Sequence, residues 1–140
     1  MVEIEHLWVL YGDLAAVKDL SFTIPKGEVF GFIGPNGAGK TSTIKVLATI
    51  LQPARGRARI SGVNVQAFPQ AVRRKIGYVP DFFGVYDDLT VEEYLHFFAA
   101  AYRVDRAKRV AVVGDVLALT DLEGKRTSPV DALSLSLIHI

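Results

Sequence analysis

Apolar and polar residues alternate through much of the first part of the chain, and this spacing predicts β-strands. Residues 2–10 alternate loosely, and residues 20–24 alternate strictly up to a tight turn at residues 25–27. Residues 28–33 are apolar at nearly every position. A strand with that composition is expected to be covered on both faces, as in a parallel sheet.

Two more strand regions follow later in the chain. Residues 57–65 predict a short strand pair around a turn at Ser61 and Gly62. Residues 75–79 predict another strand, which ends at Pro80 because proline cannot donate a hydrogen bond to a neighbouring strand.

Helical spacing of apolar residues begins at Lys40. After it, apolar positions three or four residues apart form one stripe, at Ile44, Leu47, Ala48 and Leu51. Pro53 and Gly56 lie just beyond the expected end of this helix. One or two helical turns are predicted at residues 69–75, where Arg73, Arg74 and Lys75 are expected to form a solvated face.

The last third of the chain predicts two longer helices. Thr90 and Glu93 form a capping-box pattern at the start of the first, whose apolar stripe is Val91, Leu95, Phe98 and Tyr102. The second is expected at residues 105–119, with one apolar face formed by Val110, Val113 and Leu117. The order of elements is therefore β-rich, then strand–loop–helix, then α-rich.

The composition narrows the class of protein. Hydrophobic residues make up 50% of the 140 positions and charged residues 22%, which is a globular balance. The formal net charge is +1, so no overall field favours nucleic acid, and we expect no nucleic-acid partner. The absence of cysteine excludes disulfides and thiolate metal sites, and the three histidines lack a metal-binding pattern.

The main candidate site is the glycine-rich segment at residues 34–41, which we call the phosphate loop. It matches the P-loop pattern and lies between a predicted buried strand and a predicted helix. Its glycines let backbone N–H groups approach phosphate oxygens, and the helix adds the positive end of its dipole. In such a loop Lys40 binds the β- and γ-phosphates and the Thr41 hydroxyl coordinates Mg²⁺.

The predicted ligand is therefore ATP with Mg²⁺. The candidate phosphate-binding residues are Gly34, Pro35, Asn36, Gly37, Ala38, Gly39, Lys40, Thr41 and Ser42. The hydroxyls of Ser42 and Thr43 are further candidates for contact with the α-phosphate. The alternative is a glycine-rich turn that matches the pattern by chance, and the flanking strand and helix argue against it.

Three segments together resemble the ATP-binding subunits of ABC transporters: residues 11–22, residues 34–42 and residues 76–80. The resemblance extends from residue 1 to about residue 134. It implies an α/β fold, with a P-loop NTPase core, an N-terminal antiparallel β-subdomain and the beginning of a helical subdomain, as an incomplete domain. It also implies that Tyr11 stacks on adenine and that Val17 belongs to the ATP-binding set. The alternative for Tyr11 is a strand-end tyrosine without a ligand.

The resemblance implies further roles after Pro80. The family usually has a glutamine that contacts Mg²⁺ and the attacking water at the position of Asp81. A carboxylate is also an oxygen ligand, although Asp81 is equally well explained as a turn cap. The aromatic Phe82, Phe83 and Tyr86 correspond to the region that receives a transmembrane permease subunit or domain. The alternative is that these rings pack beneath the helix that begins after Thr90.

The resemblance also implies a dimer with a second ATP-binding subunit and a cytoplasmic location, peripheral on the inner face of the cell membrane through the permease. The domain prediction is an ATP-binding β-subdomain and P-loop core at residues 1–80, and a coupling segment with a partial helical subdomain at residues 81–134. A DNA-repair or chromosome-organising P-loop ATPase is the alternative class. A third possibility is a nucleotide-binding regulator without catalysis.

Leu133 and Ser134 match the start of the family's signature loop, but the glycines that normally follow are replaced by Leu-Ser-Leu-Ile-His-Ile at residues 135–140. That hexapeptide resembles the translation of a transposon end used in preparing sequencing libraries. We therefore expect residues 135–140 to be a non-native tail, the alternative being a natural hydrophobic terminus. On this interpretation the fragment binds nucleotide but lacks the hydrolytic machinery of the parent ATPase.

Overall fold

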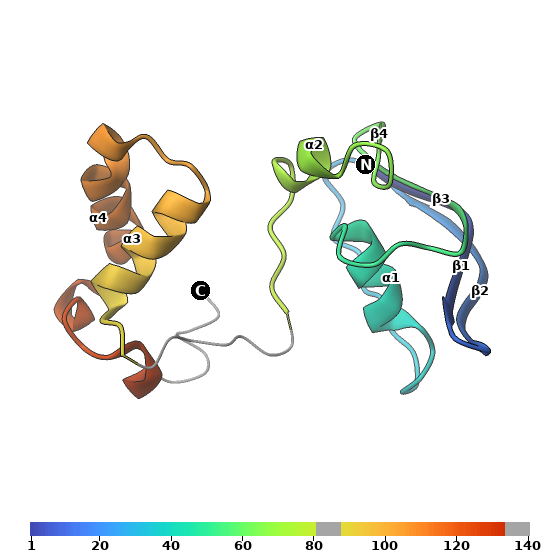
Figure 1. Cartoon of the computed structure of the whole chain (residues 1–140), viewed down its shortest axis with the longest axis horizontal. Helices are drawn as coiled ribbons and strands as arrows, with labels where there is room; N and C mark the ends of the chain where they lie inside the picture. The colour runs from blue at the N-terminus through green and yellow to red at the C-terminus, as the bar shows by residue number, and fades with distance from the viewer. Residues whose placement is uncertain (81–87, 134–140) are drawn as a thin grey trace. The chain divides into compact units, whose positions relative to one another are not determined.

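The computed structural model of the chain describes residues 1–80 and 88–133 (Figure 1). The chain divides into two compact units, Met1–Tyr78 and Val79–Ile140. Each unit has a hydrophobic core of its own. Among the described residues, the structure contains no helix whose length and apolar character would allow it to cross a membrane.

The first unit contains a four-stranded antiparallel sheet with the order β2-β1-β3-β4. Its strands are β1 (Val2–Tyr11), β2 (Leu14–Ile24), β3 (Arg55–Ile60) and β4 (Val63–Asn64). The central strand β1 pairs with both long neighbours, so that Val2 faces Ile24 of β2 and Ile60 of β3. The predicted strands at residues 2–10 and 20–24 and the strand pair at residues 57–65 are confirmed, although β2 begins earlier than predicted.

A bulge in β1 places its apolar residues on the core side of the sheet. Ile4 and Leu7 are both buried although they lie three positions apart, which uninterrupted alternation would not allow. The register with β2 shifts between these two residues, and His6 in the gap has a φ of 48°. Gly56 of β3 passes so close to the His6 carbonyl group that no β-carbon would fit there. The loose alternation in residues 2–10 therefore reflects a bulge.

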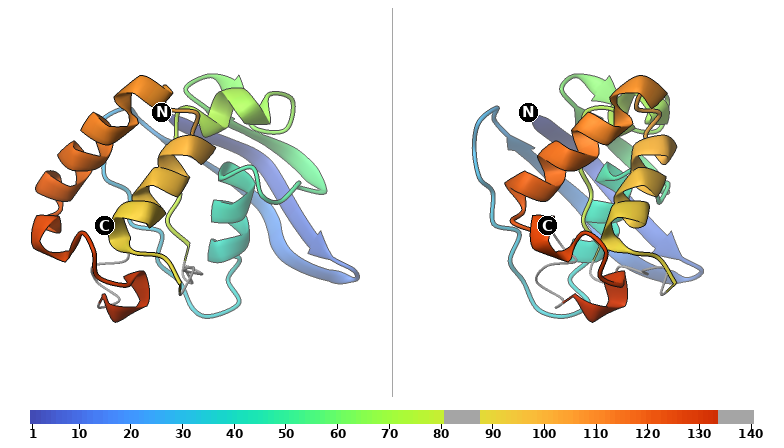
Figure 2. Two further views of the ribbon diagram at one scale, coloured as in Figure 1. Left: turned by 60° about the vertical axis from the view of Figure 1, so that its left-hand side comes forward. Right: turned by 90° about the vertical axis from the view of Figure 1, so that its left-hand side faces the viewer.

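Helices α1 (Lys40–Leu47) and α2 (Pro69–Arg73) pack with the sheet in one core (Figure 2). Val46 of α1 and Val72 of α2 are both fully buried. The predicted apolar stripe of the first helix is partly wrong, because Ile44 is 43% exposed and Val46 faces the core instead. The buried face of α1 is therefore rotated about the helix axis, so that it includes Thr43 and Val46 and leaves Ile44 exposed.

Residues 73–75 are exposed, as predicted, and Arg73 in addition forms hydrogen bonds to another part of the unit. Its Nε donates a hydrogen bond of 2.7 Å to Oγ1 of Thr49, and its Nη2 donates one of 3.2 Å to the Thr49 carbonyl oxygen. Thr49 follows the end of α1 and has a φ of 63°, an uncommon conformation for a β-branched residue. Arg73 thus connects α2 to the carboxyl end of α1.

The predictions of strands at residues 28–33 and 75–79 are wrong for this structure, which has no strand at either place. Val29 and Ile33 are almost fully exposed, whereas Phe30 stacks on Phe22 of β2 with ring centroids 5.3 Å apart. A strand requires a neighbour that exchanges backbone hydrogen bonds with it. No described residue pairs with either segment, so the apolar pattern alone does not produce a strand.

The second unit is helical. It contains α3 (Val91–Ala101) and α4 (Arg109–Leu119), which pack side by side in the views of Figure 2. The described residues of this unit also form short 3₁₀ segments: η1 (Arg106–Lys108), η2 (Glu123–Lys125) and η3 (Val130–Ala132). Its buried residues are Val91, Ala99, Val113, Leu117, Leu122, Val130 and Leu133. The two predicted helices are confirmed.

Two residues of the predicted apolar stripes in this unit are exposed. Tyr102 is 77% exposed because α3 ends at Ala101 and the tyrosine lies just beyond the helix. Val110 in the first turn of α4 is 71% exposed, while Val113 and Leu117 are buried as predicted. The prediction that Tyr102 and Val110 belong to the buried apolar faces of these helices is therefore wrong.

The capping box at the start of α3 is confirmed. The Thr90 hydroxyl accepts a hydrogen bond from the Glu93 backbone, and the Glu93 carboxylate accepts one of 2.9 Å from the Thr90 backbone. The Thr90 hydroxyl also donates to that carboxylate at 2.7 Å. These donors hold the pKa of Glu93 below its ordinary value, since they stabilise the charged carboxylate.

We expect Thr90→Ala to destabilise the helical unit by about 1 kcal/mol, because the first turn of α3 loses its cap. Thermal unfolding followed by circular dichroism measures this, with Thr127→Ala at an exposed threonine as the control. Because the pKa of Glu93 is lower in the folded state, the stability that its carboxylate contributes through the capping box is fully present above the unfolded-state pKa. That stability is lost as the pH falls through the folded-state pKa. An equal effect of both substitutions would contradict this role for Thr90.

Candidate functional site

The phosphate loop leads directly into α1, whose backbone donors are left open at its amino end. The N-cap of α1 is Gly39, with a φ of 82°, and no side chain caps the helix. Thr43 is not available to a ligand, because it is buried and its hydroxyl donates to the Gly39 carbonyl oxygen at 2.9 Å. Its predicted contact with the α-phosphate is therefore wrong. The uncapped first turn of α1 leaves backbone N–H groups free to bind an anion.

Lys40 is held by the backbone of its own loop. Its Nζ donates hydrogen bonds to the carbonyl oxygens of Gly34, at 2.6 Å, and Pro35, at 2.7 Å. A lysine ammonium has three donors, so these two bonds fix its position and leave one donor for a ligand. Gly34 and Pro35 themselves do not line the pocket described below.

The loop rests against β2 through Gly39. A β-carbon on Gly39 would lie 2.5 Å from the carbonyl oxygen of Ala16 and 2.7 Å from a methyl carbon of Val17. Val17 is buried and belongs to the core of the unit. The structure thus places Val17, predicted from the resemblance as an ATP-binding residue, behind the loop, where it supports the loop.

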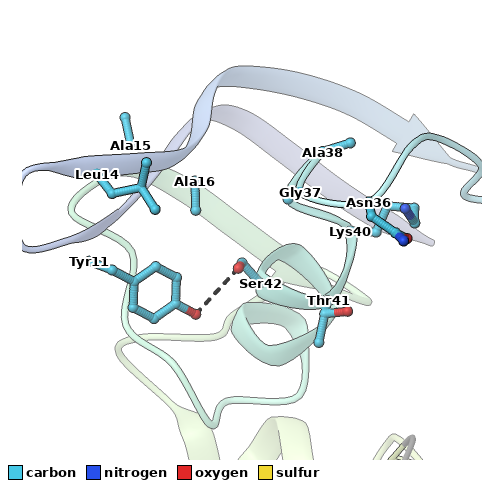
Figure 3. Close-up of a pocket in the computed structure, with 11 residues that line it drawn as sticks. Tyr11, Leu14, Ala15, Ala16, Asn36, Gly37, Ala38, Lys40, Thr41 and Ser42 are labelled. Atoms are coloured by element: carbon cyan, nitrogen blue, oxygen red, sulfur yellow. Dashed lines mark hydrogen bonds between the residues drawn. The ribbon is translucent and has the colours of Figure 1, made fainter.

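An open pocket of about 350 Å³ lies between the loop and the β1–β2 hairpin (Figure 3). Its lining comes from both sides and consists of Tyr11, Leu14, Ala15, Ala16, Asn36, Gly37, Ala38, Gly39, Lys40, Thr41 and Ser42. The hairpin side carries a tyrosine ring and small or aliphatic side chains, and the loop side carries backbone and cationic donors. The pocket therefore has an apolar end and a polar end.

Tyr11 lies at the apolar end of this pocket, at the last position of β1. It is 47% exposed, and its hydroxyl lies 3.3 Å from Oγ of Ser42 (Figure 3). The structure thus brings Tyr11 together with the phosphate loop, from which it is separated by more than twenty positions in the sequence. The sequence analysis did not predict that Leu14, Ala15 and Ala16 line the pocket. The turn immediately after Tyr11 could have indicated this, because a hairpin brings the residues after the turn close to Tyr11.

Several candidate residues lie outside the described part of the chain. These are Asp81, the predicted Mg²⁺ contact, and Phe82, Phe83 and Tyr86, the predicted permease contacts. Among the described residues, no three acidic, histidine or cysteine side chains form a group that could hold a metal ion. His6 lies with its Nδ1 2.7 Å from a carboxylate oxygen of Asp19, an exposed pair on the bulged strands.

Comparison with known proteins identifies ABC transporter proteins as relatives of this chain. The sequence pattern of the ABC transporter family matches residues 17–137. The chain is 35% identical to the Nod factor export ATP-binding protein I of Paraburkholderia xenovorans over 133 residues, which are 95% of this chain and 44% of that protein. It is 37% identical over 102 residues to the probable multidrug ABC transporter ATP-binding protein YbhF of Escherichia coli, covering 73% of this chain and 18% of that protein.

A solved structure of an ATP-binding subunit of an ABC transporter matches 99% of the chain with a TM-score of 0.81 and 30% identity. The match covers 58% of the solved chain. It confirms the predicted fold class, a P-loop α/β fold with an antiparallel β-subdomain and part of a helical subdomain. The chain spans less than half the length of the curated relatives that it matches here.

The two glycines with positive φ in the phosphate loop provide a matched test of how the loop rests on β2. Gly39→Ala forces a methyl group against the Ala16 backbone, and we expect a loss of about 2–4 kcal/mol in the free energy of unfolding. Gly37 has nearly the same φ, 83°, but open space around it, so Gly37→Ala is expected to cost only about 1–2 kcal/mol. Urea unfolding of both variants measures the difference, and equal losses would contradict the close approach.

Proposed function

Because this chain belongs to the ABC transporter family, we propose that it is the nucleotide-binding part of a transport ATPase and binds ATP with Mg²⁺ at the phosphate loop. The observation that carries the proposal is the position of Lys40. Its ammonium group is fixed by two loop carbonyl oxygens beside the uncapped amino end of α1. A cation, open backbone N–H groups and a helix amino end together favour a polyphosphate.

The pocket fits the remainder of a nucleotide. Its volume of about 350 Å³ lies in the range of small-molecule sites. Tyr11 and the hairpin residues Leu14, Ala15 and Ala16 offer a π face and apolar surface to a base. We therefore propose that the base stacks on Tyr11 while the phosphates lie on the backbone of residues 36–42.

Thr41 is the described residue proposed to hold Mg²⁺. It is exposed in the pocket lining, so its hydroxyl is accessible from the nucleotide side. Magnesium ions in nucleotide sites are held mainly by phosphate oxygens and water, so one protein hydroxyl and a nearby carboxylate are sufficient. We propose Asp81 as that carboxylate. The bound ion supplies charge neutralisation between the phosphates, and the protein positions it.

The complete protein is proposed to couple ATP hydrolysis to transport through a transmembrane permease and a second ATP-binding subunit, at the inner face of the cell membrane. The family match and the two relatives, one named for multidrug transport and one for Nod factor export, support this proposal. We propose that the 140-residue chain binds nucleotide without hydrolysing it, because none of the strands among the described residues ends in an acidic side chain that could act as the general base for water. Phe82, Phe83 and Tyr86 are the proposed permease contacts.

Lys40→Ala tests the ATP site. The variant loses a charged hydrogen-bond donor to the phosphates, and we expect its dissociation constant for MgATP to rise by about ten- to a hundredfold. Isothermal titration calorimetry measures the change. Lys45→Ala, one turn further along the same helix and outside the pocket lining, is the matched control. Unchanged affinity in Lys40→Ala would refute the assignment.

Thr41→Val tests the metal contact while preserving the shape of the side chain. Wild-type protein is expected to bind ATP more tightly with Mg²⁺ than with excess EDTA, because the Thr41 hydroxyl would help to hold the ion, which would offset the negative charge of the phosphates. In Thr41→Val this advantage should shrink, while binding in EDTA stays near the wild-type value. An undiminished Mg²⁺ effect would show that Thr41 is not a ligand.

A further inference from the structure

The hydroxyl groups of Tyr11 and Ser42 form a contact that the phosphate-binding role of the loop does not require. Their oxygens are 3.3 Å apart, and both side chains line the pocket (Figure 3). The contact joins the end of β1 to the first turn of α1. We propose that Ser42 is a positioning residue for the base, acting through the Tyr11 hydroxyl to hold the aromatic ring in the orientation that stacks.

The ring of Tyr11 needs such a support. Tyr11 lies beside the hairpin turn, and its side chain is about half exposed. An exposed ring rotates among rotamers, and stacking on a base requires one orientation of its face. If the ring were free, its ordering would oppose each binding event, whereas a ring already held in place binds with a smaller entropic loss.

Ser42 is suited to provide that support, because its helix is well anchored. The next residue, Thr43, is buried and donates to the Gly39 carbonyl oxygen, and Val46 one turn later is fully buried in the core. The Ser42 hydroxyl therefore has a fixed position relative to the loop. The 3.3 Å separation is longer than that of a typical hydrogen bond between hydroxyl groups, so removing the contact is expected to have a modest effect on binding.

The proposal assigns Ser42 a role different from direct contact with the α-phosphate, and it rests on the proposed ATP site. The two roles differ in which part of the ligand they affect. A positioning role through Tyr11 matters only for a ligand with a base. A direct phosphate contact matters equally for a ligand without one.

The experiment compares MgATP with magnesium tripolyphosphate, which has the phosphates but no base, by isothermal titration calorimetry on the full chain. Tyr11→Phe keeps the ring and removes its hydroxyl, and Ser42→Ala removes the other partner. Each is expected to weaken MgATP binding by about two- to fivefold, with tripolyphosphate binding close to wild type. The double variant should be no weaker than either single variant, because both remove the same interaction.

Tyr102→Phe, at an exposed tyrosine of the helical unit, is the control and should bind both ligands as the wild type does. Equal weakening of both ligands in Ser42→Ala would overturn the proposal in favour of a direct phosphate contact. Unchanged or tighter MgATP binding in Tyr11→Phe would also overturn it. Lys40→Ala separates this failure from failure of the ATP site itself, because that variant should lose both ligands if the site is correct.

Discussion

Gly39 lies so close to β2 that a side chain at its position would collide with the backbone of Ala16. This close approach determines the geometry of the whole candidate site. It sets the distance between the hairpin, which carries Tyr11, and α1, which presents its uncapped amino end. Only glycine satisfies both requirements there, since the position combines a φ of 82° with no room for a β-carbon.

The antiparallel sheet makes that approach possible. The bulge at His6 keeps the apolar residues of β1 on the core side, and the buried Val17 of β2 packs behind the loop. Val46 attaches α1 to the same core. The cavity is therefore bounded by parts that are each fixed by buried contacts, while its lining remains open to solvent. The arrangement of Lys40 on two loop carbonyl oxygens adds a cation whose position does not depend on a ligand.

Local patterns predicted the elements whose stabilising partners lie nearby in the chain. The capping box of Thr90 and Glu93 and the P-loop spacing at residues 34–41 each specify contacts within a few residues, and alternation specified β1 and its hairpin. Residues 28–33 could not be predicted in this way, because a strand depends on a neighbour that the apolar pattern does not identify. The Arg73–Thr49 contact and the support role of Val17 depend on packing between distant segments, which spacing does not reveal.

The central claim is that the phosphate loop and the β1–β2 hairpin form one nucleotide site. The most direct measurement is a titration of isotopically labelled protein with MgATP, followed by backbone amide and aromatic resonances in nuclear magnetic resonance spectra. The account predicts saturable shifts concentrated at the amides of residues 36–42 and at the Tyr11 ring. Shifts confined to other residues, or none at saturating MgATP, would contradict it.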